Sequence, residues 1–63
     1  MKKPNDCMYS VNDVSKIIGV STRTVRRWIE EELIAIHRFG GQIRIAEADL
    51  QAFIASRRIA GKL

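Results

Sequence analysis

The sequence has few of the residues that form a catalytic or metal site, because it contains only one cysteine and one histidine. It also has no long apolar run. A single cysteine, Cys7, cannot form an internal disulfide, and its one distant companion, His37, does not complete a metal-ligand set. We therefore expect no metal ion and no cofactor.

Targeting and membrane signals are also missing. No segment approaches the roughly 18 consecutive apolar residues of a membrane-spanning helix, and no apolar stretch of the signal-peptide kind follows Lys2-Lys3. We therefore expect a cytoplasmic location without membrane association. Internal repeats, linkers and low-complexity tracts are absent from the sequence.

The chain is short, with 63 residues and 7.2 kDa, which suits one small domain. A chain of this size buries only about 60% of its unfolded surface, and a ligand pocket of roughly 300–1,000 Å³ needs more wall than it can supply. No nucleophile and base stand at a recognisable spacing, and no phosphate-cradling loop is present. The consecutive acids Glu30, Glu31 and Glu32 splay around a helix end instead of converging. These absences predict a protein that is not an enzyme and has no small-molecule substrate.

The sequence carries more positive than negative charge. It contains 11 Lys and Arg residues against 7 Asp and Glu, which gives a net charge of +4 and a pI near 9.9. The distribution is informative, because the segment from Lys16 to Arg27 holds four basic residues and no acid. A segregated basic surface is the electrostatic footprint of a nucleic-acid-binding protein.

Two helices joined by a tight turn are predicted after a loose, polar arm at residues 1–8. The first begins at Ser10, which can accept hydrogen bonds from the first turn, and Asp13 completes a capping-box-like pair. Gly19 ends this helix as a left-handed cap, and Ser21 caps the second helix. The apolar spacing predicts one buried stripe on each helix, made of Val11, Val14, Ile17 and Ile18 on the first and of Val25, Trp28 and Ile29 on the second.

After residue 33 the apolar residues no longer follow a helical spacing, and the new pattern predicts a β-hairpin. Two segments, 34–39 and 42–45, are rich in β-branched residues and flank Gly40-Gly41, which is typical of a two-residue hairpin turn. The turn sets the strand register, and alternation then directs four isoleucines to the core. The expected pairs are Phe39 with Gln42, Arg38 with Ile43, His37 with Arg44 and Ile36 with Ile45, and the core isoleucines are Ile34, Ile36, Ile43 and Ile45.

A third helix follows residues 46–49, with a buried stripe of Leu50, Phe53 and Ile54, before a frayed tail at residues 59–63. The expected fold is mainly α with a small β-hairpin: a winged helix-turn-helix domain over residues 9–58, with its core centred on Trp28. In a helix-turn-helix unit the second helix enters the DNA major groove by its N-terminal residues.

The second helix is predicted to display its basic residues, because Arg23 and Arg27 lie opposite Val25 on the helical wheel. We predict phosphate contacts from Ser21 and Thr22, contacts to phosphates or guanine edges from Arg23, Arg26 and Arg27, and a contact to a thymine methyl group from Thr24. The glycine tip of the hairpin can approach DNA closely, and Arg38 and Arg44 can enter a minor groove or clamp its phosphates. Other roles compete at three positions: a helix cap for Ser21, a surface pair with Glu30 for Arg26, and stacking on His37 or Phe39 for Arg44.

One longer pattern runs through residues 9–55. It comprises Tyr9-Ser10-Val11, Val14, Ile17-Ile18-Gly19-Val20-Ser21, Thr24-Val25 and Trp28-Ile29, followed by Gly41-Gln42-Ile43-Arg44-Ile45, Asp49-Leu50 and Phe53-Ile54. This combination resembles the excisionase-type DNA-binding domains, a short branch of the MerR-like winged helix-turn-helix superfamily. The sequence departs from the family pattern at Ile34, a position where a proline often precedes the first wing strand, and at Ile43, where an aromatic residue is frequent.

The resemblance implies a recombination directionality factor. Such proteins bind and bend double-stranded DNA at attachment sites of a prophage or integrative element, bind cooperatively at adjacent sites, and help an integrase assemble the excisive complex. It implies a recognition helix from Ser21 to about Glu31 and wing contacts from Arg38, Gly40, Gly41, Gln42 and Arg44. Two rival functions stay open: a small winged-helix transcription regulator, and a protein-interaction adaptor or antitoxin-like module.

Overall fold

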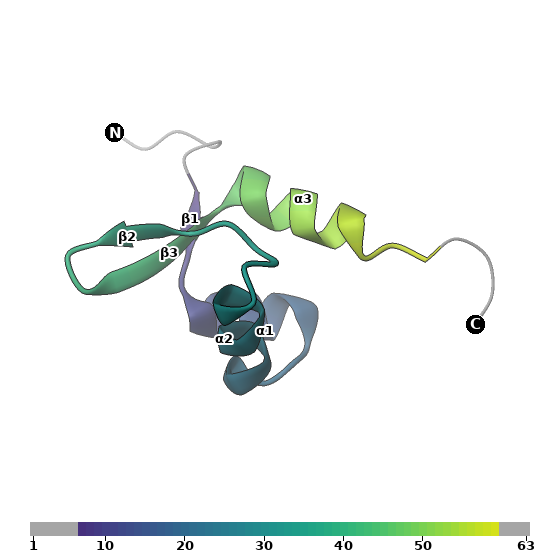
Figure 1. Ribbon diagram of the computed structural model, residues 1–63, viewed down its shortest axis with the longest axis horizontal. Coiled ribbons are helices and arrows are strands. Elements are labelled where there is room, and N and C mark those ends of the chain that lie inside the picture. The colour runs from purple at the N-terminus through teal and green to yellow at the C-terminus, as the bar shows by residue number, and fades with distance from the viewer. Residues whose placement is uncertain (1–6, 60–63) are drawn as a thin grey trace.

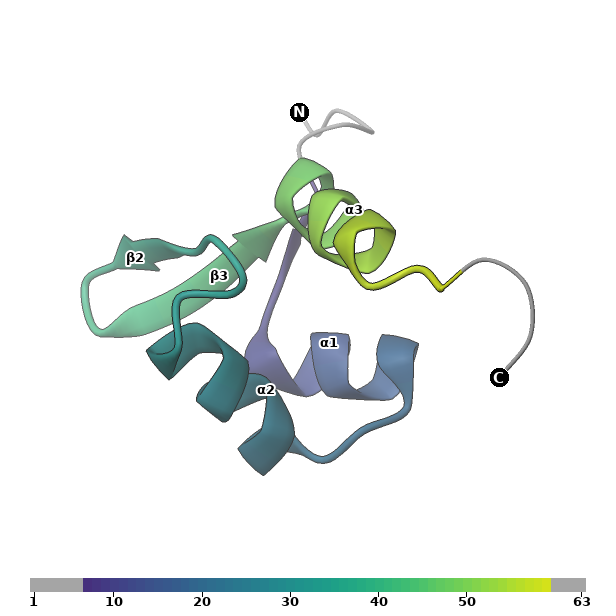
Figure 2. The same cartoon turned by 45° about the vertical axis from the view of Figure 1, so that its right-hand side comes forward.

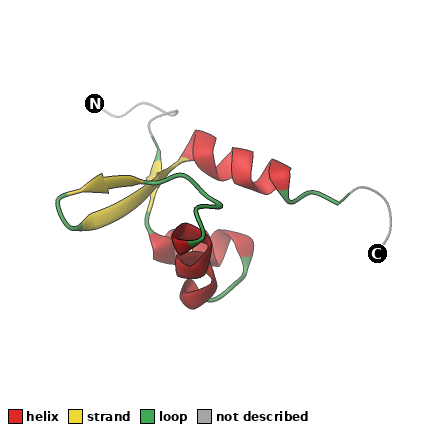
Figure 3. Ribbon diagram, in the orientation of Figure 1, coloured by secondary structure: helices red, strands yellow, loops and turns green. Residues whose placement is uncertain are grey.

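The computed structural model describes residues 7–59, which form three helices and a three-stranded antiparallel sheet (Figure 1). The elements in chain order are β1 (Met8–Tyr9), α1 (Val11–Ile18), α2 (Thr22–Glu30), β2 (His37–Phe39), β3 (Gln42–Ala46) and α3 (Glu47–Ser56). β3 is the central strand, between β1 and β2. Helices α1 and α2 lie together below the sheet, α3 lies above them, and the β2–β3 hairpin projects to the left as a wing (Figures 2 and 3). The predicted winged helix-turn-helix architecture is confirmed.

The helix boundaries are set by local capping, as predicted. The Ser10 hydroxyl accepts a hydrogen bond from the Asp13 amide at 3.0 Å, and the Asp13 carboxylate accepts one from the Ser10 amide at 3.1 Å. These reciprocal bonds are a complete capping box. Gly19 ends α1 with a left-handed φ of 88°, and the Ser21 hydroxyl accepts from the Thr24 amide at 3.2 Å to begin α2. The turn from Gly19 to Ser21 therefore holds the two helices in one fixed arrangement.

α2 ends in a capping motif that was not predicted from the sequence. The Glu32 amide donates to the Ile29 carbonyl at 3.0 Å, and the Leu33 amide donates to the Trp28 carbonyl at 2.9 Å. These two bonds form a Schellman motif, which places one residue in the left-handed region. That residue is Glu32, with a φ of 59°, where glycine is the usual choice.

The wing has the predicted register at its tip. Phe39 pairs with Gln42, Arg38 with Ile43 and His37 with Arg44. The fourth expected pair, Ile36 with Ile45, is absent from the ladder because β2 begins only at His37. Gly40 has a φ of +60° whereas Gly41 lies outside the left-handed region, which is the pattern of a type II′ turn.

β1 was not predicted, and it places Met8 in a strand although the loose arm was expected to reach that residue. Met8 pairs with Ala46, and Tyr9 pairs with Ile45. Two residues are too few to show strand alternation, so the sequence carries no local signal for this element. The rest of the predicted arm, residues 1–6, and most of the predicted tail, residues 60–63, lie outside the described residues.

A side-chain hydrogen bond fastens β1 to the start of α3. The Tyr9 hydroxyl donates to the Glu47 carboxylate at 2.6 Å, and Gln51 donates to the same carboxylate at 2.9 Å. The bond to Glu47, with a smaller contribution from desolvation, raises the pKa of Tyr9 to about 12. The bonds from Tyr9 and Gln51 lower the pKa of Glu47. Folding therefore favours a protonated Tyr9 beside an ionised Glu47.

The core draws one or two side chains from each of α1, α2, β3, α3 and the loop before the wing. Its buried members are Val11, Val14, Val25, Ile34, Ile45, Leu50 and Phe53, and Ile36 and Ile43 pack against them from the core side of the wing. The inward direction of the four wing isoleucines is therefore confirmed.

Trp28 is not the centre of this core, contrary to prediction. Val14, Val25 and Ile45 have no exposed surface, whereas Trp28 is only partly buried and lies against Phe53, with ring centroids 4.7 Å apart. The close contact of α1, α2 and β3 has room for valines but not for an indole. The ring is therefore placed at the edge, between α2 and α3.

Two further stripe residues are exposed rather than buried. Ile17 is 53% exposed because α1 buries the opposite flank of its stripe, where Ser15 is buried and donates to the Asn12 carbonyl at 2.7 Å. Ile54 is 40% exposed because α3 rests on the core through Leu50 and Phe53.

Candidate nucleic-acid interface

The three arginines of α2 all point away from the core. Arg23, Arg26 and Arg27 are exposed, while Val25 on the other side of the helix is fully buried. Between residues 7 and 59, the only contact of salt-bridge length joins His37 Nε2 and Asp49 Oδ2, which lie 3.6 Å apart, so the alternative pairing of Arg26 with Glu30 does not form there. The guanidinium groups are therefore available to an external anion.

The start of α2 adds uncharged donors to this surface. The Ser21 hydroxyl caps the helix and lies 3.1 Å from the Thr24 hydroxyl, so its role as a cap is confirmed. The amides of Thr22 and Arg23 belong to the first turn, where no intrahelical acceptor exists. Together with the helix dipole, these amides favour a negatively charged group at this end of the helix.

On the wing, Arg44 is held in place by its neighbours. Its Nη1 donates to the Ile43 carbonyl at 2.8 Å, and its Nη2 donates to the Gln42 side-chain oxygen at 2.5 Å. The Arg44 guanidinium thus contacts Ile43 and Gln42, while His37 and Phe39 stack on each other. Arg38 is exposed and, with Arg26, lines a small hollow between the wing and α2.

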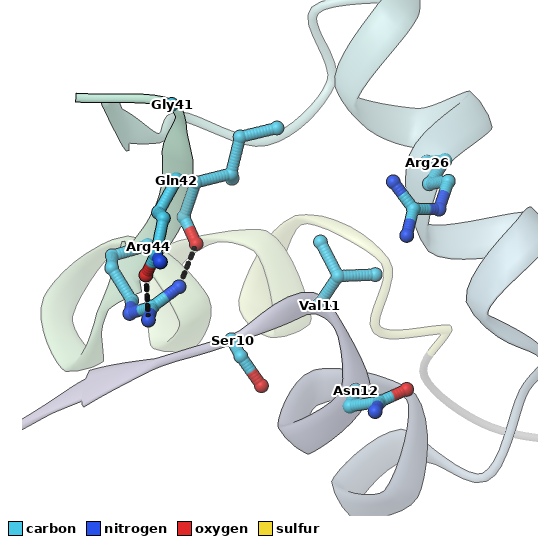
Figure 4. Close-up of a pocket in the computed structure, with 8 residues that line it drawn as sticks. Ser10, Val11, Asn12, Arg26, Gly41, Gln42 and Arg44 are labelled. Atoms are coloured by element: carbon cyan, nitrogen blue, oxygen red, sulfur yellow. Dashed lines mark hydrogen bonds between the residues drawn. The ribbon is translucent and has the colours of Figure 1, made fainter. Parts of the chain in front are cut away.

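A groove of about 310 Å³ separates α2 from the wing (Figure 4). Arg26 forms one wall, Gln42 and Arg44 form the opposite wall, and the start of α1 forms the floor with Ser10 and Asn12. In the close-up, the Arg26 guanidinium projects from α2 into this space and faces the wing. Two cationic side chains on facing walls favour an anion between them. The groove thus combines α1, α2 and the wing into one concave, positively charged surface.

In a comparison with known protein families, residues 8–58 match a family described as a helix-turn-helix domain. The chain belongs to this helix-turn-helix domain family. No curated protein and no solved structure matches the chain. The family and the observed fold are those of a small DNA-binding domain, and α2 occupies the position of the recognition helix.

In this helix-turn-helix domain the predicted contact residues are brought to a common side. Arg26 faces the same groove as Gln42 and Arg44 of the wing, and Gly41 borders it. Arg23 and Arg27 line an adjoining hollow with Arg26 and Thr22, which Glu30 also borders. Sequence reasoning missed Ser10 and Asn12, which reach the groove only because β1 brings the start of α1 under the wing. The signal that could have indicated them is their place at a helix N-terminus, where backbone amides are free to bind anions.

Among residues 7–59, no three His, Cys, Asp or Glu side chains are grouped as metal ligands, and no helix there is long and apolar enough to cross a membrane. Cys7 is a free thiol beside β1.

Proposed function

We propose that this helix-turn-helix domain places α2 in the major groove of double-stranded DNA and its wing in the adjacent minor groove. The observation that carries the proposal is the groove with Arg26 and Arg44 on facing walls. When a helix and a wing occupy neighbouring grooves, the sugar-phosphate backbone between them must pass through the space that separates them. A space of this position and charge suits that backbone.

Within this arrangement, the residues of α2 have separable roles. Arg23 and Arg27, on the outermost face, are assigned to guanine edges or phosphates, and Thr24 to a thymine methyl group. Ser21 and Thr22 are assigned to a phosphate at the helix start. Arg38, Gly40, Gly41, Gln42 and Arg44 form the contacts of the wing.

We further propose that the protein is an excisionase, a recombination directionality factor that bends attachment-site DNA to promote excision by an integrase. The support is the sequence resemblance over residues 9–55. An architectural role also agrees with the cations and the free amides at the start of α2. The integrase and a neighbouring copy on adjacent sites are the expected protein partners.

The first experiment measures whether duplex DNA is the ligand. With about five phosphate contacts, a plot of log K against log salt concentration should have a slope near −4 to −5. A flat plot, or no binding, would favour the adaptor or antitoxin-like alternative.

Footprinting over the DNA flanking the neighbouring recombinase gene, with and without that recombinase, then separates the two DNA-binding roles. Protection that extends when the recombinase is added supports excision, and protection confined to a promoter supports transcription regulation.

A variant of α2 tests the assigned contact. Arg23→Ala should weaken binding to the footprinted site by about 1–3 kcal/mol if Arg23 reads guanine, with less effect on random duplex. Equal losses on both duplexes would make Arg23 a phosphate contact. Arg58→Ala removes the same charge just after α3 and is the matched control, because Arg58 is exposed but does not border the groove.

A further inference from the structure

The wing tip carries an aromatic ring that the core does not use. Phe39 is 55% exposed at the end of β2, directly before Gly40. It is absent both from the buried core and from the partly buried side chains that pack against the core. Alternation along β2 directs it to the face of the hairpin opposite Arg38. The ring therefore lies outside the apolar core of the domain.

The Phe39 ring nevertheless contacts another ring of the wing. The His37 ring stacks on it with centroids 6.1 Å apart and an interplanar angle of 18°. His37 itself lies 3.6 Å from the Asp49 carboxylate on α3. These contacts run in succession from α3 to the wing tip. An aromatic ring that is exposed at the tip and stacked on a neighbouring ring is suited to a contact with another molecule.

The turn beside the ring is narrow. Gly40 and Gly41 have no side chains, and a Cβ added at either position would meet nothing within 4 Å. The minor groove of B-DNA is only about 6 Å wide, so a hairpin tip with bulky turn residues would be stopped at its rim. A glycine tip allows the residue next to it to reach the base edges.

From these observations, and resting on the proposed placement of the wing in the minor groove, we propose that Phe39 is a wedge that partly unstacks one base step. Minor-groove proteins commonly kink DNA by inserting an apolar side chain between base pairs. The ligand class is a duplex with a flexible pyrimidine–purine step, TA or CA/TG, under the wing tip. Arg44 lies on the same face of the hairpin as Phe39, so it can bind a phosphate beside the opened step.

The test uses the full chain and a duplex of about 30 base pairs that carries the footprinted site. Bending is measured by energy transfer between dyes at the two ends, and unstacking by 2-aminopurine placed at the step under the wing. The variants are Phe39→Ala and the conservative Phe39→Leu. Ile17→Ala is the matched control, because Ile17 is 53% exposed on α1 and lies outside the groove and the wing.

We expect the unmodified protein to raise both the energy transfer and the 2-aminopurine fluorescence. Phe39→Ala should lose both signals while it keeps salt-dependent binding and an unchanged melting temperature, and Phe39→Leu should restore part of each. Ile17→Ala should behave as the unmodified protein.

Two results overturn the wedge and leave the proposed function intact: bending and fluorescence that persist in Phe39→Ala, or bending by the unmodified protein without any rise in 2-aminopurine fluorescence. An unmodified protein that shows no salt-dependent binding to any duplex overturns the proposed function and the wedge together.

Discussion

The left-handed backbone conformation of Glu32, at the end of α2, leads to a prediction about stability. The Schellman bonds of Glu32 and Leu33 require a φ near the observed 59° at Glu32. A side chain with a Cβ costs about 1–2 kcal/mol in this region. Glycine removes that cost. It also gives the unfolded chain more conformational freedom, which lowers the free energy of unfolding by about 0.5–1 kcal/mol. Glu32→Gly should therefore raise the free energy of unfolding by about 0.5–1 kcal/mol.

Thermal unfolding followed by far-UV circular dichroism can resolve this change. In a domain of this size, 1 kcal/mol corresponds to about 4–8 °C, so we expect the melting temperature to rise by roughly 2–8 °C. Glu32→Ala is the control, because it removes the same negative charge from the helix end but keeps the Cβ. An equal rise in both variants would refute the reasoning, since the gain would then come from charge and the helix dipole rather than from backbone strain.

Three further predictions concern the wing tip, the β1–α3 contact and the core. Gly41→Ala should leave the melting temperature nearly unchanged but weaken duplex binding in fluorescence anisotropy, and full binding by this variant would exclude a close approach of the tip to DNA. Gly40→Ala, at a φ of +60°, should cost about 0.5–1 kcal/mol of stability by the same balance of strain and unfolded-chain freedom. Because folding raises the pKa of Tyr9 from 10.0 to about 12, stability should fall as the pH rises through that interval, and urea titrations of Tyr9→Phe should lack this loss. The lowered pKa of Glu47 predicts a second loss of stability as the pH falls through and below its ordinary value of 4.5, which Glu47→Gln should remove. Ile45→Val, at a position with no exposed surface, should lower the free energy of unfolding by about 0.5–1.5 kcal/mol in the same titrations.

The features predicted correctly from the sequence are those that a few neighbouring residues determine. Ser10 and Asp13 are sufficient for the capping box, and Gly19 is sufficient for the end of α1. The wing register follows from a two-residue turn and alternation alone. The outward direction of the α2 arginines follows from the position of Val25 and the helical period.

The features that were missed depend on segments far apart in the chain. β1 exists because Met8 and Tyr9 pair with the end of β3, and two residues carry no periodic signal of their own. The edge position of Trp28 depends on how α3 lies over α2. The groove likewise forms only when the start of α1 is brought beneath the wing. Tertiary packing, rather than local propensity, decided each of these.

β3 runs into α3 without an intervening loop: Ala46 is the last residue of the strand and also the N-cap of the helix. The wing and α3 are consequently joined with no intervening residue, and the Tyr9–Glu47 hydrogen bond lies at their junction. A spectroscopic label at the exposed Ser56, at the far end of α3, would lie outside the groove between α2 and the wing, where it can be used to test whether the wing and α3 move together.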